Sequence, residues 1–152
     1  MAGVYLALKF IHILSAIVAV GSNITYGVWS ARSSGQPVPT SFALKGIKFI
    51  DDRIANPAYG VLLVTGLVMV FLGHFSITAL WVIVALAGFV AVAVLGVAVY
   101  SPLLRDQIRL ADAGDVTSPE AVALSRRGRI FGPVLGIIVL VILAMMVFKP
   151  TL

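Results

Sequence analysis

Two ionisable side chains, Lys9 and His12, stand inside the first apolar segment of the chain. The stretch YLALKFIHILSAIVAVGSN, residues 5–23, is otherwise composed for a membrane. A lysine near the centre of a span costs about 2.5–3.5 kcal/mol, so ionisable groups at this depth are functional hypotheses by default. Neutral imidazole is the usual axial ligand of b-type haem in helical bundles. We therefore predict that His12 ligates the iron of haem b or a related porphyrin, with Lys9 holding a propionate near the interface.

The sequence leaves the second ligand of such a haem open. Met69 follows Pro57 at the same spacing at which Met145 follows Pro133, which puts the two thioethers at one depth. Thioether sulfur binds haem iron or Cu(I), although methionine is also an ordinary filler of apolar cores. His74, at the end of the second span, is the third candidate. A five-coordinate iron is the remaining option.

A packing role is the alternative for both ionisable side chains. A buried histidine can bond to a facing carbonyl or hydroxyl, and Ser15 and Thr65 are the hydroxyls considered for His12. Lys9 can extend its side chain to the nearer membrane surface. Under this alternative the chain binds no cofactor.

The composition places these residues in a bilayer. The 152 residues are 61% hydrophobic and 11% charged, and mean hydropathy is +1.10. Soluble domains average about 45–50% apolar and about 25% charged residues, so this chain cannot hide its apolar surface in a soluble core. The net charge of +5 indicates anionic lipid headgroups and membrane topology, not nucleic acid.

Four segments are long enough to cross hydrocarbon as helices, which takes about 20 apolar residues. They run over about 4–29, 55–73, 77–100 and 130–148 of a single domain, 1–152. No basic region precedes the first segment, so we interpret it as a retained span and not a signal peptide. The predicted fold class is an all-α membrane protein, a four-transmembrane-helix bundle.

Basic residues predict the orientation of the bundle. Both long connections, 30–54 and 101–129, are rich in lysine and arginine, whereas the turn HFS between spans two and three has none. By the positive-inside rule, both connections are cytoplasmic. We expect a bacterial inner-membrane protein with both termini on the outer side.

The long connections carry helix signals and an internal repeat. Ser41 is expected to cap a short amphipathic helix on the inner leaflet, and Ser118 with Pro119 to open the fourth helix. Span two begins RIANPAYG at Arg53 and span four begins RIFGPVLG at Arg129. The shared pattern R-I-x-x-P-x-x-G predicts two αα-hairpins related by a parallel internal repeat.

Small and polar residues within the spans suggest helix contacts. Gly128, Gly132 and Gly136 form a ridge on span four, for packing within the chain or in a homodimer or larger complex. Asn23 and Thr25 are expected to form interhelical hydrogen bonds. The aromatic residues near span ends are expected to be interfacial anchors: Tyr5, Trp29, Trp81 and Tyr100.

Several kinds of chemistry are not expected. The chain has no cysteine, which excludes disulfides, thiolate metal sites and covalent c-type haem. No carboxylate falls within a predicted span, which argues against a proton-coupled carrier. No phosphate loop, metalloprotease helix or nucleophile elbow is present. The sequence therefore assigns no catalytic residue and leaves open whether the protein is an enzyme.

The stretches LKFIHILSAIVAVG, DDRIANPAYGVLLVTG and VFKP resemble a bacterial family of small four-helix predicted integral membrane proteins without assigned function. The resemblance covers nearly the whole chain. More distantly, the pattern is similar to HemJ-type protoporphyrinogen oxidases and CopD-type copper resistance proteins. The HemJ resemblance implies haem b, with His12 at the position of its first-span ligand and Arg53 at that of the arginine before its second span.

The third span departs from the HemJ pattern. That pattern has a functional lysine shortly after a tryptophan, whereas LWVIVALAG has Trp81 but Ala85 near the lysine position. This departure argues against porphyrin oxidation, and haem binding through His12 is the expected function. The alternative is a non-catalytic accessory or structural subunit of a larger membrane complex.

Overall fold

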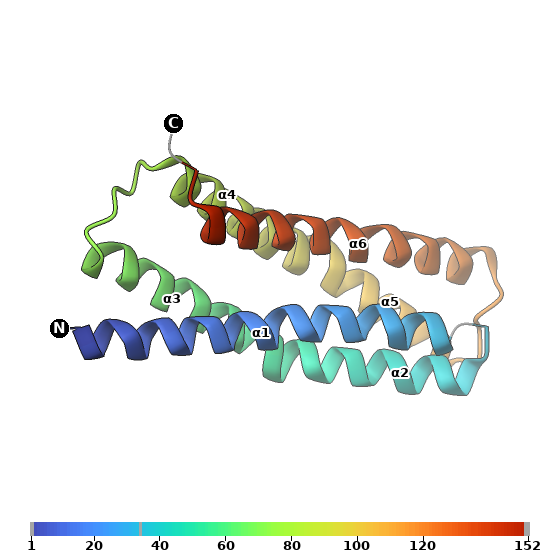
Figure 1. Cartoon of the computed structure of the whole chain (residues 1–152). Helices are drawn as coiled ribbons and strands as arrows, with labels where there is room; N and C mark the ends of the chain where they lie inside the picture. The colour runs from blue at the N-terminus through green and yellow to red at the C-terminus, as the bar shows by residue number, and fades with distance from the viewer. Residues whose placement is uncertain (1, 34, 151–152) are drawn as a thin grey trace.

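The computed structural model describes residues 2–33 and 35–150 and is helical throughout, with no strand in that part of the chain. Figure 1 shows the helices as one elongated bundle. In chain order they are α1 Ala2–Ser33, α2 Pro37–Ile50, the π-helical segment η1 Asp51–Ala55, α3 Asn56–Leu72, α4 Leu80–Leu95, the π-helical segment η2 Gly96–Tyr100, α5 Ser101–Asp112 and α6 Pro119–Phe148.

The helices form four membrane-length rods in two antiparallel hairpins. The rods Gly3–Ser33, Pro37–Leu72, Leu80–Asp112 and Pro119–Phe148 are each long and apolar enough to cross a bilayer. α1 packs on α3, and α4 packs on α6. Both termini lie at one end of the bundle (Figure 1), which we call the terminal end. The predicted four-helix fold is confirmed, whereas the internal repeat stays a prediction.

The opposite end, which we call the basic end, carries the turns that join α1 to α2 and α5 to α6. Nine of the eleven lysines and arginines lie towards it, all but Lys9 and Lys149. There α2 packs against both α1 and α5 and so ties the two hairpins together. Each rod is longer than the roughly 20 residues that hydrocarbon requires, so the basic end extends past the membrane-spanning layer.

The amphipathic helix expected from Ser41 begins earlier and is not a separate surface helix. α2 starts at Pro37, after Gln36, and runs without interruption through η1 into α3. A proline fits the first helical turn because its missing N–H would have no helical partner there. Ser41 instead lies one turn inside α2, where its hydroxyl bonds Asp112 of α5. The prediction of a cap at Ser41 was wrong.

Both π-helical segments end just before a proline. In η1 the N–H of Asn56 bonds the carbonyl of Asp51, and in η2 the N–H of Ser101 bonds that of Gly96. Pro57 and Pro102 follow directly, and each lacks the N–H that an α-helix needs. The wider π turn accommodates the missing hydrogen bond at each proline. Pro133, by contrast, lies inside the uninterrupted helix α6, so the matched R-I-x-x-P-x-x-G motifs fold differently.

The turn between the second and third rods is longer than expected. α3 ends at Leu72 and α4 begins at Leu80, three residues after the predicted start at 77. His74 adopts a φ of 53° in this turn. Trp81 follows at once and is buried, with its ring at 5.4 Å from that of Phe75. It is therefore a packing residue and not the interfacial anchor that was expected.

The fourth rod begins as predicted. Ser118 caps α6 by accepting a hydrogen bond from the N–H of Ala121 at 3.1 Å, and Pro119 occupies the first turn. α6 ends at Phe148, and Lys149, its C-cap, has a φ of 44°. The ammonium of Lys149 lies 4.5 Å from the centre of the Phe75 ring and 5.2 Å from that of Trp81. This cation–π stack holds the end of α6 against the α3–α4 turn.

Neighbouring helices approach each other closely at glycines, which have no side chain. At Gly88 of α4 a Cβ would lie 2.8 Å from Cγ1 of Ile142 on α6. At Gly66 of α3 a Cβ would lie 3.1 Å from Cε1 of His12 on α1. Each hairpin therefore has at least one helix contact that a larger residue would disturb.

Candidate functional site

His12 lies half-buried between α1 and α3, with its ring against Gly66. Its Nδ1 is 2.9 Å from the hydroxyl oxygen of Thr65. Thr65 is itself buried, with 6% of its surface exposed. Of the two hydroxyls considered for His12 in the packing alternative, that of Thr65 is therefore the one that the ring contacts. Gly66 permits this contact because the imidazole occupies the space of a side chain.

The hydrogen bonds around Thr65 fix the tautomer of His12. The hydroxyl proton of Thr65 goes to the carbonyl of Val61, at 2.6 Å. Thr65 can then only accept from His12, so Nδ1 carries the proton and donates it. Nε2 of the neutral ring is left as the unprotonated nitrogen. This is the form in which histidine binds a metal, with Nδ1 held by a neighbouring group.

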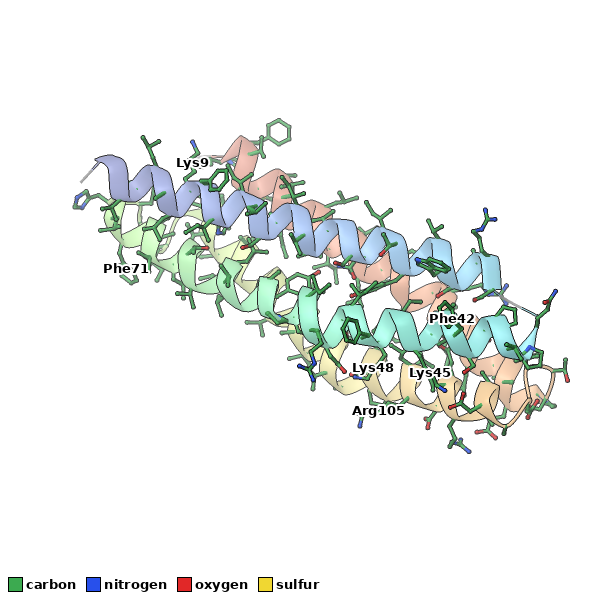
Figure 2. All side chains as sticks on the ribbon, turned by 90° about the horizontal axis from the view of Figure 1, so that it is seen from below. Lys9, Phe42, Lys45, Lys48, Phe71 and Arg105 are labelled. Carbon is green, nitrogen blue, oxygen red and sulfur yellow. The ribbon has the colours of Figure 1, made fainter. Side chains whose placement is uncertain are left out.

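The structure places two of the other predicted residues near this layer. Lys9 is on α1, one turn before His12, and is exposed at the terminal end (Figure 2). Met69 is on α3, one turn after Thr65 and therefore on the same face; its side chain is half-buried.

The remaining predicted residues have other surroundings. Met145 packs against the cluster of Val70, Trp81 and Val82, so its side chain is part of an apolar core. His74 is exposed in the α3–α4 turn. Arg53 is exposed in η1, roughly 18 Å from Thr65 along the helix axis at 1.5 Å per residue. Arg53 is thus at the basic end, away from His12.

The glycine ridge of α6 is only partly used within the chain. A Cβ at Gly128 would meet the side chain of Gln107 at 3.2 Å, so this glycine packs on α5. At Gly132 and Gly136 a Cβ would meet no atom within 4 Å. These two glycines therefore face outward from the chain.

Sequence reasoning missed a polar layer near the basic end, formed by Asn23, Tyr26, Asp51, Tyr59 and Tyr100. The amide of Asn23 donates to the phenol oxygen of Tyr59 at 2.5 Å, which confirms its predicted interhelical bond. Tyr26 is 5% exposed, and its phenol oxygen makes no hydrogen bond of good geometry in the described part of the chain, although it lies close enough to the Asp51 carboxyl for a bond of poorer geometry. Asp51, Tyr59 and Tyr100 all lie within electrostatic reach of it.

Two predictions about single polar and aromatic residues were wrong in this region. Tyr100 packs against the buried cluster around Leu104 and is not a free interfacial anchor. The hydroxyl of Thr25 bonds the carbonyl of Ser22 on its own helix at 2.7 Å, not a neighbouring helix.

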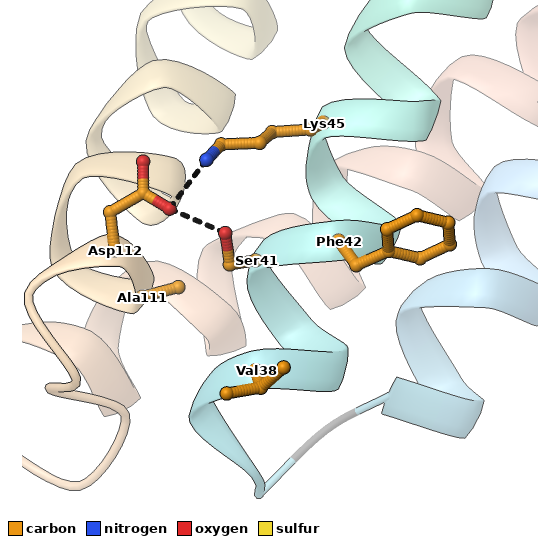
Figure 3. A pocket seen from close by; sticks show the side chains of 6 residues that line it. All are labelled: Val38, Ser41, Phe42, Lys45, Ala111 and Asp112. Atoms are coloured by element: carbon orange, nitrogen blue, oxygen red, sulfur yellow. Dashed lines mark hydrogen bonds and ion pairs between the residues drawn. The ribbon is translucent and has the colours of Figure 1, made fainter.

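A second polar contact joins the hairpins beyond the membrane-spanning layer (Figure 3). Asp112 of α5 accepts from the hydroxyl of Ser41 at 2.5 Å and pairs with the ammonium of Lys45 at 2.7 Å. A cavity of about 300 Å³ adjoins them, with Phe42 and Val38 on its rim. Because Lys45 and Ser41 of α2 both bind Asp112 of α5, this contact ties the two helices together.

The number of possible metal ligands near His12 limits which metal-containing groups could bind there. Among the described residues, no three histidine or acidic side chains gather in a group that could hold a bare metal ion. A single histidine supplies one ligand, so any metal bound here would have to bring its other ligands with it. A haem does so, because its four pyrrole nitrogens leave the protein to supply one or two axial ligands.

Comparison with known proteins gives one match. Residues 6–150 match the model of a family described as "Predicted integral membrane protein (DUF2269)". No curated protein and no solved structure matches the chain. The resemblance to HemJ-type and CopD-type proteins stays a prediction.

Proposed function

The chain belongs to this family of predicted integral membrane proteins, and we propose that it binds a b-type haem or related porphyrin in the bilayer through Nε2 of His12. The observation that supports the proposal is the hydrogen bond from His12 Nδ1 to Thr65, at 2.9 Å. It orients the ring and leaves the other nitrogen, Nε2, to act as a ligand. In this proposal His12 is the metal ligand.

The neighbouring residues have distinct roles in this proposal. Lys9 lies at the terminal end, where its ammonium can pair with a propionate at the membrane surface. Met69 is the axial candidate on the same face of α3 as Thr65, ahead of Met145 and His74. A bound haem supplies redox or ligand-binding chemistry at its iron, while the chain positions it and excludes water.

The test is the absorbance spectrum of the protein purified in mild detergent, before and after addition of haem. We expect a Soret band that is lost in His12→Ala. Thr65→Val should keep the band with weaker haem affinity, by about 10-fold or more, because second-shell partners of metal-binding histidines have effects of this size. His74→Ala tests the ranking of the second ligand and should leave the band unchanged, because His74 is exposed in the α3–α4 turn. A protein that stays colourless with added haem would overturn the proposal.

We further propose that the basic end faces the cytoplasm of a bacterial cell and that both termini lie outside the inner membrane. The support is the concentration of lysine and arginine at that end. A reporter fused after Leu152 should be active only outside the cytoplasm. Cytoplasmic activity of the fusion would refute the orientation, independently of any cofactor.

A second candidate function is that of an accessory or structural subunit in a larger membrane complex. The observation in its favour is that Gly132 and Gly136 of α6 face outward without a neighbour in the chain. Small residues of this kind let another helix approach closely, in a homodimer or a complex. Native gels of mildly solubilised membranes discriminate the two. Migration only as a free monomer or dimer would count strongly against the larger complex.

A further inference from the structure

A groove between α5 and α6, separate from the residues of the proposed haem site, combines an apolar wall with a charged rim. Its volume is about 360 Å³, which is at the lower end for ligand pockets. The wall is made by apolar side chains of η2, α5 and α6: Ala98, Val99, Leu103, Leu124 and Phe131. The rim is made by Asp106 and Arg127.

The groove changes from apolar to charged along the membrane normal. Ala98 and Val99 belong to the last turn of the apolar run that ends at Tyr100. Asp106 lies roughly 12 Å further along the rod, at 1.5 Å per residue. On the antiparallel helix α6, Phe131 is at the apolar end and Arg127 one turn towards the charged end. The same order, hydrocarbon then charge, occurs in a phospholipid at the membrane boundary.

The positive charge of Arg127 is not neutralised by an acidic residue in the described part of the chain. Within the described part of the chain, Asp106 is paired with Arg109 at 3.8 Å, and Arg109 also bonds Glu120 at 3.1 Å. Arg127 has no ion pair there, nor do its neighbours Arg126 and Arg129. A guanidinium with free donors matches a phosphate, which it can bind through two parallel hydrogen bonds.

The two helices that form the groove are held together by contacts that do not involve a ligand. The side-chain amide of Gln107 on α5 donates to the carbonyl of Leu124 on α6 at 3.0 Å. Gly128 leaves room for that side chain, because a Cβ there would lie 3.2 Å from the Gln107 nitrogen. α5 and α6 are thus fixed on either side of Arg127, which lowers the cost of ordering on binding.

We propose that this groove binds one anionic phospholipid, whose phosphate bonds Arg127 and whose first acyl carbons lie on the wall between Ala98 and Phe131. The apolar wall, and the position of the groove at the boundary of the membrane, favour a lipid over a soluble phosphate. The positive charge of the surrounding arginines favours an anionic headgroup over a zwitterionic one.

The experiment measures lipid binding to the full chain in detergent, by native mass spectrometry, with phosphatidylglycerol and phosphatidylcholine of equal acyl length. We expect tighter retention of phosphatidylglycerol, and an affinity about fivefold lower in Arg127→Gln, the effect of one basic residue near an anionic surface. Arg126→Gln is the matched control: it removes the same charge from the adjacent position, which does not line the groove, and should change the affinity little.

A second variant tests the apolar wall without changing charge. Ala98→Trp fills the membrane end of the groove and should lower phosphatidylglycerol retention while the helical circular dichroism is kept. Equal losses in Arg127→Gln and Arg126→Gln, or full retention in Ala98→Trp, would overturn the proposal. Inorganic phosphate that competes with the lipid at equal concentration would identify a soluble-anion site instead.

Discussion

The contact between α4 and α6 at Gly88 allows a stability change to be predicted from distances. In Gly88→Ala the new Cβ would lie 2.8 Å from Cγ1 and 3.1 Å from Cδ1 of Ile142, and 3.6 Å from Cγ2 of Ile138. Forcing a methyl group into a packed contact costs about 1–3 kcal/mol. Replacing glycine by alanine in a helix returns about 0.8–1 kcal/mol. The net expectation is a destabilisation of about 0–2 kcal/mol.

Gly21→Ala separates these two effects. Gly21 lies within α1, and a Cβ there would meet no atom within 4 Å. This variant therefore gains helix propensity without the clash, and the difference between the two variants isolates the contact, at about 1–3 kcal/mol. Unfolding in mixed micelles with increasing sodium dodecyl sulfate, followed by far-ultraviolet circular dichroism, gives both values.

The double variant Gly88→Ala/Ile142→Ala locates the cause. Ile142→Ala alone opens a cavity, but because Ile142 is only half-buried the cost should be below that of a fully buried position, about 2–5 kcal/mol. In the double variant the added methyl occupies part of that cavity, so the combined loss should be smaller than the sum. Equal stabilities of Gly88→Ala and Gly21→Ala, or additive losses in the double variant, would refute the close contact between α4 and α6.

Three further predictions concern single polar groups. Tyr26→Phe should change stability by less than about 1.5 kcal/mol in the same micelle assay, because the buried phenol it removes lies beside the Asp51 carboxyl but makes no hydrogen bond of good geometry; a larger loss would contradict this description of the phenol. Thr65→Val should destabilise by about 0.5–1.5 kcal/mol in the absence of haem, through loss of the acceptor of His12, and a stability equal to wild type would contradict that bond. Hydrogen bonds from Ser118, first from its hydroxyl and then from its backbone N–H, hold the pKa of the Asp115 carboxyl below its ordinary value. Their stabilisation is present above about pH 4 and is lost as pH falls through the lowered pKa. Amide exchange at Ser118 should thus rise at low pH in the wild type, beyond its intrinsic pH dependence, and be insensitive to that titration in Asp115→Asn.

The sequence was sufficient for the elements that depend on local chemistry. Apolar length identified all four membrane rods, and the serine–proline pair Ser118–Pro119 identified the start of α6. Thr65 could be named as a partner of His12 because both residues are polar and fall within facing spans of one hairpin. These inferences need only hydropathy, capping and antiparallel pairing.

The polar layer could not be found in the same way. Asp51 was assigned to a loop because the apolar run begins only after it, whereas the rod continues through η1 and carries the carboxylate close to Tyr26. The turn at His74 was taken as three residues, which placed Trp81 at a surface it does not reach. Both errors arise because hydropathy reports where hydrocarbon begins and not where a helix begins.

Because of the stack of Phe75, Trp81 and Lys149, the two tryptophans of the chain have different surroundings and should differ in fluorescence. The chain has two tryptophans. Trp81 is 7% exposed beneath a cation at the terminal end, whereas Trp29 is 49% exposed near the basic end. An aqueous quencher therefore reaches mainly Trp29, and a change in the remaining emission reports on Trp81. Intrinsic fluorescence can thus distinguish release of the C-terminal segment from loosening of the basic end, without any added label.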